Sequence, residues 1–142
     1  MHLKLAVTLS LTGVVMALGT SLIGLQGAEF FLWMGFYVLW IAATLRVRPD
    51  RPFLTLLVAS VLSGLWTGLF QLLLRDQYVA HNPAYAADFA ALADASTLEW
   101  AMSFVGFGLA AGLVFGLVVG AIGWGLARRG YLRAPALARA AR

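Results

Sequence analysis

The chain has 142 residues, of which 62% are hydrophobic and only 11% are charged, and its net charge is +4. Soluble domains carry roughly a quarter charged residues, so this apolar surface cannot be hidden in a 15.2 kDa globule and lipid must cover part of it. The absence of cysteine excludes disulfides and cysteine-based metal sites. The basic residues are too few for the broad basic face that nucleic acid requires, so we expect no nucleic-acid partner.

Two apolar runs open the chain. The first, residues 5–24, follows Lys4 and is longer than the hydrophobic region of about 7–15 residues in a signal peptide, so we expect it to remain as a membrane span. The second run covers residues 28–45. Only residues 25–27 separate the two, which predicts a tight turn and an antiparallel pair of helices.

Two further runs cover residues 53–74 and 100–126. A helix needs about 20 apolar residues to cross a bilayer, and each of the four runs approaches or exceeds that length. The turn before the third run contains Pro49 and Pro52, which end one helix and open the next. The sequence therefore predicts an all-α fold: a single transmembrane domain (1–142) of four helices, with spans 1 and 2, and spans 2 and 3, as antiparallel neighbours.

The longest connection, residues 75–99, joins the third and fourth runs. Asn82 before Pro83 is typical of a helix N-cap followed by proline at the first helical position. Apolar side chains then recur at helical spacing: Tyr85, Phe89 and Leu92. We expect a short amphipathic surface helix over about 83–94 in this outer loop. Ser96 and Glu99 form a capping box that starts the fourth span.

Charge is distributed unevenly about the predicted spans. Nine of the ten basic residues flank the spans on one side, and five of the six acidic residues lie on the other. Cytoplasmic loops are enriched in Lys and Arg, so both termini are predicted to be cytoplasmic, in a bacterial inner membrane. The Arg-rich tail (128–142) either binds anionic lipid headgroups through Arg128, Arg129 and Arg133 or is a solvated tail that anchors the topology.

Small residues recur every four positions in the fourth span: Gly108, Gly112, Gly116 and Gly120. Matching stripes occur in the first span (Gly13, Ala17, Ser21) and in the third (Ser60, Gly64, Gly68). Small residues allow helices to approach closely within lipid. Two interpretations follow: packing within one bundle with the fourth span at its centre, or self-association between copies, with a pore as one form. Thr67 and Gln71 are expected to hydrogen-bond across helices.

Glu29 is the acidic residue closest to the bilayer. Ionisable residues in a membrane mark functional sites, but Glu29 stands at the start of the second span, where it also suits the helix dipole and the topology. The aromatic residues of the second span could line a ligand pocket, although lipid contact and bundle packing are commoner uses. Catalytic motifs are missing, so we expect no enzyme activity, no cofactor and no metal site.

Two stretches resemble a family of uncharacterised four-span bacterial integral membrane proteins, known only as a domain of unknown function. One is residues 112–122, GLVFGLVVGAI, followed by Arg128 and Arg129, and the other is the exit of the third span with an outer loop containing Pro83. The resemblance implies four spans, a long outer loop and a glycine-rich last span. The family has no agreed activity or functional residues.

Three functions are consistent with these observations. The first is a non-catalytic small integral membrane protein that acts through helix–helix contacts, as an accessory subunit or envelope organiser. The others are a small homo-oligomeric channel or carrier, and a lipid-binding protein that uses the surface helix and the Arg tail. The expected partners are the lipid bilayer and, through the fourth span, further copies or a larger membrane complex.

Overall fold

In the computed structural model of the chain, residues 1–25 and 27–140 are described, and the side chains of residues 86 and 131–140 lie outside that description. The described residues form helices and turns, without a strand. Four helical stretches are long and apolar enough to cross a membrane: Leu3–Leu22, Glu29–Val47, Pro52–Leu73 and Thr97–Gly130. The predicted all-α architecture with four candidate membrane spans is therefore confirmed.

The first span is divided into α1 (Leu3–Ser10) and α2 (Thr12–Leu22). At the break, the Ser10 hydroxyl donates to the Val7 carbonyl at 2.8 Å, and the Thr12 hydroxyl donates to the Leu9 carbonyl at 2.8 Å. Hydroxyl groups that bond the preceding helical turn compete with the backbone ladder and bend helices. The division at Leu11 follows from this pair of side chains.

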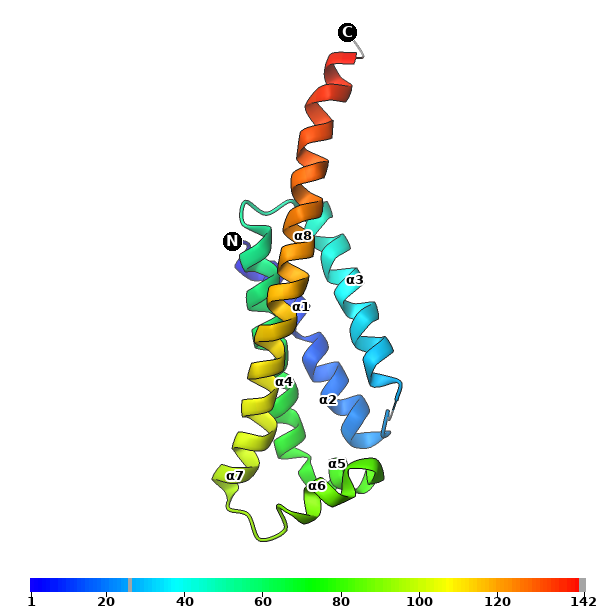
Figure 1. Cartoon of the computed structure of the whole chain (residues 1–142), viewed down its shortest axis with the longest axis vertical. Helices are drawn as coiled ribbons and strands as arrows, with labels where there is room; N and C mark the ends of the chain where they lie inside the picture. Colours follow the sequence, from blue (N-terminus) through cyan, green and yellow to red (C-terminus); the bar gives the residue numbers. More distant parts are fainter. Residues whose placement is uncertain (26, 141–142) are drawn as a thin grey trace.

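The second and third spans are α3 (Glu29–Val47) and α4 (Pro52–Leu73). Arg48, with φ of 53°, ends α3 in the left-handed conformation, and Pro52 occupies the first turn of α4, as the prolines predict. The N-terminus and the α3–α4 turn lie at one end of the molecule, here called the inner end (Figure 1). The segment between α4 and the last span lies at the opposite, outer end (Figure 1).

The fourth span begins with α7 (Thr97–Ala101), continues through a π-helical turn, η2 (Met102–Gly106), and becomes the long helix α8 (Phe107–Ala140). The predicted capping box is present: the Glu99 amide donates to the Ser96 hydroxyl at 3.4 Å, and the Ser96 amide donates to the Glu99 carboxylate at 2.7 Å. Of the predicted headgroup ligands, the side chain of Arg133 lies outside the described residues.

The central helix is α4, which packs along α8 on one side and against α1 and α2 on the other. The prediction that the fourth span is central was wrong, because the third span carries small residues toward both the first and the fourth. Helix α3 is peripheral, with limited contacts to α8, α4 and α2, and it stands apart from the bundle toward the outer end (Figure 1). Its inner half holds Tyr37 and Trp40 in the main core with Leu56, Ala59 and Val119.

The outer segment differs from the predicted single helix over 83–94. It contains α5 (Arg75–His81), the 3₁₀ turn η1 (Pro83–Tyr85) and α6 (Ala86–Ala90), followed by turns. Asn82 does not act as an N-cap through its side-chain oxygen; instead its amide nitrogen donates to the carbonyls of Thr20 at 2.9 Å and Tyr78 at 2.7 Å. This fully buried side chain ends α5 and fixes the outer segment to the end of α2.

Candidate functional site

The small residues of α4 and α8 lie against one another. A methyl group in place of the hydrogen at Gly112 would lie 2.6 Å from the Ser60 carbonyl oxygen, and one at Gly68 would lie 2.5 Å from that of Phe104. Gly64 and Gly108 face each other so closely that a methyl group on either would overlap the carbonyl oxygen of the other. The two backbones approach as closely as these residues allow.

The remaining predicted stripe positions also contact this chain. Gly116 and Gly120 of α8 face Leu57 and Phe53 of α4, with 3.0 Å between an added methyl group and the nearest side-chain atom in each case. On the other side of α4, Gly13 lies against the backbone of Ser63, while Ala17 and Ser21 are fully buried. The small stripes are therefore occupied by contacts within one chain.

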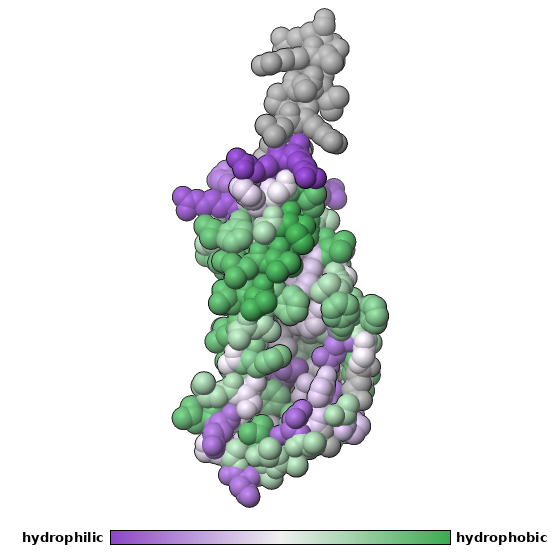
Figure 2. All heavy atoms as spheres, viewed as in Figure 1, coloured by the Kyte–Doolittle hydropathy of each residue, from purple (hydrophilic) through white to green (hydrophobic). Residues whose placement is uncertain are grey.

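A cavity of about 700 Å³ opens where α3 leaves the bundle, bounded by α2, α3, α4, η2, α8 and the outer segment. Figure 2 shows pale and purple polar residues in the outer half of the molecule, whereas a hydrophobic green surface covers the half nearer the inner end. Cavities of about 300–1,000 Å³ with apolar walls and a few polar groups are typical of small-molecule sites. The cavity has this size and this kind of lining.

Aromatic rings form a large part of its walls. Tyr37 stacks on Trp33 and on Phe115, with ring centroids 5.8 and 5.7 Å apart. At the outer end, Phe104 lies 5.3 Å from Tyr78 and 6.4 Å from Phe89. These rings hold one another in stacked and edge-to-face pairs, which fixes the shape of the walls.

One side of the cavity faces away from the bundle. The rings of Phe30, Phe107 and Phe115 line the cavity and are nevertheless 61%, 74% and 40% exposed. Because all three belong to candidate membrane spans, this opening faces the region that lipid would occupy.

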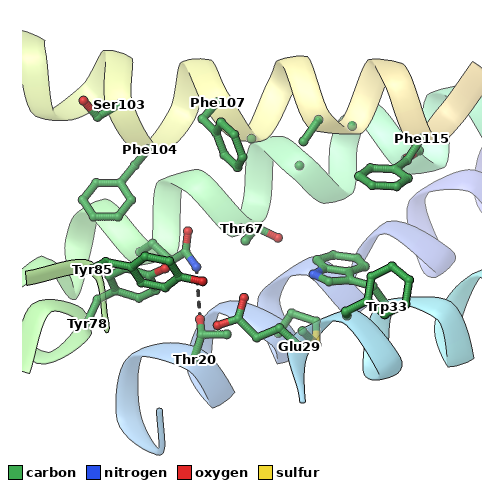
Figure 3. A pocket seen from close by; sticks show the side chains of 18 of the residues that line it. Thr20, Glu29, Trp33, Thr67, Tyr78, Tyr85, Ser103, Phe104, Phe107 and Phe115 are labelled. Carbon is green, nitrogen blue, oxygen red and sulfur yellow. Dashed lines mark hydrogen bonds between the residues drawn. The ribbon is translucent and has the colours of Figure 1, made fainter. Parts of the chain in front are cut away.

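Glu29 is the first residue of α3, and its carboxylate points into the cavity between α3 and α8 (Figure 3). The oxygen Oε1 is buried and has no hydrogen-bond partner among the described residues. A carboxylate oxygen withdrawn from water without a donor is costly unless a partner compensates it. Glu29, which the sequence singles out as a candidate ionisable residue, therefore lies in the cavity, and its side chain does not cap α3.

Polar groups on α2 and α4 form the floor opposite the opening. Gln71 donates through Nε2 to the Thr20 hydroxyl at 3.0 Å, drawn as a dashed line in Figure 3. The Thr67 hydroxyl lies 3.1 Å from the Gly13 carbonyl oxygen and 2.9 Å from that of Ser63. The expected bonds of Thr67 and Gln71 across helices are thus present, and they join α2 to α4 beneath the cavity.

The outer segment closes the end of the cavity. His81 Nδ1 lies 3.0 Å from the Ser21 carbonyl oxygen, and the Asn82 side chain bonds Thr20, so both hold the segment on α2. Burial raises the pKa of Tyr78 to about 12, with smaller contributions from the negative charges of Glu29 and Tyr85. The phenol of Tyr78 therefore stays neutral at ordinary pH beside the Glu29 carboxylate.

The π-helical turn η2 supplies the cavity wall facing α4. It places Ser103 and the buried Phe104 among the lining residues, at the point where the fourth span enters the bundle (Figure 3). Single π turns cost hydrogen-bond geometry and occur frequently at functional sites. Sequence reasoning missed this turn, because no local pattern distinguishes it from the surrounding helix.

The predicted lipid-headgroup residues Arg128 and Arg129 lie away from the cavity, at the inner end. Arg128 places its guanidinium 4.6 Å from the centre of the Trp124 ring, and Arg129 is exposed beside it. Four of the predicted small residues have two roles, because they join α4 to α8 and also line the cavity: Ser60, Gly64, Gly108 and Gly112. Sequence reasoning missed Tyr78, Phe89 and Phe104 as lining residues.

Comparison with family models, curated proteins and solved structures finds no match to this chain. The resemblance to the uncharacterised four-span family stays a prediction. The fold and the site therefore define the class on their own: a helical protein with four candidate membrane spans and a cavity lined by residues of these spans and of the outer segment.

Proposed function

We propose that this protein is a non-catalytic integral membrane protein that binds one amphiphilic molecule in the cavity between α3 and α8. The observation that carries the proposal is the aromatic cavity of about 700 Å³, open on the lipid side through exposed rings of the candidate spans. Its polar groups Glu29 and Thr20 lie toward the outer end, whereas the rings of Trp33 and Phe115 line it deeper in the span (Figure 3). That arrangement matches a molecule with a polar head and an apolar tail.

The proposed orientation places both termini in the cytoplasm and the cavity in the outer leaflet of a bacterial inner membrane. The inner end carries the arginines around the α3–α4 turn together with Arg128 and Arg129 of α8. Figure 2 shows hydrophilic purple spheres at this end. The outer segment carries Asp76, Asp88 and Asp94 and a single arginine, Arg75. The Lys and Arg bias of cytoplasmic loops supports this orientation.

Filling the cavity tests the proposal. Ala111 lines the cavity, whereas the neighbouring Ala110 is exposed and does not. Replacement Ala111→Trp should weaken binding of a neutral amphiphile, monoolein, by at least about tenfold, because the indole would fill the part of the cavity that monoolein occupies. Ala110→Trp adds the same side chain to the outer face of the helix and should leave binding unchanged.

Native mass spectrometry of the purified chain in mild detergent, titrated with monoolein, counts the bound molecules directly. We expect one saturable adduct for the wild type and for Ala110→Trp, and its loss for Ala111→Trp. Equal binding by all three proteins would refute a ligand site in the cavity.

The hypothesis of an accessory subunit that acts through its glycine face has less support. The four glycines that recur every fourth residue in α8, from Gly108 to Gly120, already contact α4, so this face is not available to a further helix. An oligomer or larger complex would have to use the outward faces of α3 and α8, where Val38, Leu39 and Val118 are exposed.

A further inference from the structure

We propose that the molecule bound in the cavity is an organic cation with an apolar body, whose positive charge lies beside the Glu29 carboxylate. This inference rests on the proposed function and names the chemical class of its ligand. It follows from the charge of the lining, from the unpartnered carboxylate oxygen and from the aromatic groups around it.

The lining carries charge of one sign. Glu29 and Asp88 both line the cavity, and no Lys, Arg or His is among the described lining residues. Arg75, the arginine of the outer segment, pairs with Asp76 at 3.3 Å and lies 5.6 Å from the Trp100 ring. The cavity therefore repels anionic headgroups and attracts cations, which is selection by charge.

The position of Glu29 makes it the principal anion. Asp88 is exposed and can be neutralised by water and salt, whereas Oε1 of Glu29 is buried and accepts no hydrogen bond from the described part of the chain. An opposite charge is worth far more to a partly buried carboxylate than to an exposed one. A bound cation supplies the partner that the protein does not.

The surrounding rings favour an organic cation over a metal ion. Trp33, Tyr78 and Phe104 line the same cavity, and aromatic faces attract ammonium and similar cations. Among the described residues, no group of three or more His, Asp or Glu lies close enough to hold a metal ion. Hard metal ions need several oxygen ligands, which the rings cannot provide.

The depth of the cavity sets the shape of the ligand. Between Glu29 and Tyr37 the helix rises by about 12 Å, so the charge lies at the outer end while the rest of the cavity extends into the span. An apolar body can lie along the rings of Tyr37 and Phe115 and meet lipid at the partly exposed ring of Phe115. A small hydrated cation beside Glu29 would not contact these rings.

The test compares two probes of matched shape and opposite charge, tetraphenylphosphonium and tetraphenylborate, by equilibrium dialysis against the full chain in nanodiscs. Empty nanodiscs give the lipid background. We expect saturable binding of tetraphenylphosphonium at one per chain, and binding of tetraphenylborate weaker by at least about tenfold. Equal or stronger binding of the anion would overturn the inference, and this comparison needs no variant.

Substitution Glu29→Gln removes the charge with little change of shape. It should weaken tetraphenylphosphonium binding by at least about tenfold, while monoolein binding, which also reports that the variant is folded, changes by less than about threefold. The matched control Asp94→Asn removes an exposed charge that does not line the cavity and should weaken binding of the cation by less than about threefold. An unchanged affinity of Glu29→Gln for the cation would contradict the inference.

The two proposals fail differently. Monoolein binding that is lost in Ala111→Trp, together with no preference for the cation, leaves the ligand cavity in place and overturns only the charge assignment. Absence of both monoolein and tetraphenylphosphonium binding overturns both.

Discussion

At the scale of single residues, glycine and serine determine how closely the helices pack. Gly112 leaves room for the Ser60 carbonyl, and Gly64 and Gly108 bring the two backbones together. In lipid there is little hydrophobic force between helices, so stability depends on dispersion contacts that require this close approach. The same positions line the cavity, which places its inner wall on a rigid helix pair.

Two glycines of α8 provide a matched test of this packing. Gly112→Ala adds a methyl group 2.6 Å from the Ser60 carbonyl oxygen, whereas nothing lies within 4 Å of a methyl group at Gly125. We expect Gly112→Ala to lower the free energy of unfolding by about 2 kcal/mol through overpacking. Gly125→Ala should raise it by up to about 1 kcal/mol, because alanine favours helix.

Titration of the protein from mild detergent into sodium dodecyl sulfate, with unfolding monitored by circular dichroism, measures the free energy of unfolding of both variants. Similar shifts in the two variants would show that the tight contact at Gly112 is not needed for the fold.

At the scale of elements, local patterns predicted the parts of the fold that depend on local physics. A span requires about 20 apolar residues because its side chains lie in hydrocarbon, and a capping box is a pattern of neighbouring residues. The four runs and the capping box of Ser96 and Glu99 were therefore visible in the sequence. The conformation of the outer segment was not visible in the sequence, because it depends on the hydrogen bond from the Asn82 amide to the carbonyl of Thr20, which is distant along the chain. Local helical spacing cannot reveal such a partner.

The candidate site was only partly predictable for the same reason. Glu29 could be singled out because an acidic residue at the edge of a span is rare. The aromatic residues of the second span suggested a ligand pocket as one of their possible uses, and Trp33 and Tyr37 of that span line the cavity. The other walls could not be predicted, because the outer segment and η2 bring Tyr78 and Phe104 to the cavity from distant parts of the chain. Small-residue stripes indicated close packing and favoured contacts within one bundle over contacts between chains, but they did not identify α4 as the centre, which depends on the whole bundle.

At the scale of the whole molecule, the proposed orientation determines from which leaflet a ligand reaches the cavity. The chain has no cysteine, so single cysteines report it cleanly. Ala84 is exposed at the outer end and Asp50 is exposed at the inner end. In right-side-out membrane vesicles, a membrane-impermeant maleimide should label Ala84→Cys at once and Asp50→Cys only after permeabilisation. The reverse pattern would place the cavity in the inner leaflet.

The central claim is that the cavity holds an amphiphilic molecule in the membrane where the protein resides. Native mass spectrometry of the tagged protein, extracted from its own membrane in mild detergent, tests this claim most directly, with Ala111→Trp and Ala110→Trp extracted in parallel. We predict that the wild type and Ala110→Trp retain one small molecule per chain and that Ala111→Trp does not. Bare chains in all three preparations, or the same adduct in all three, would contradict the account.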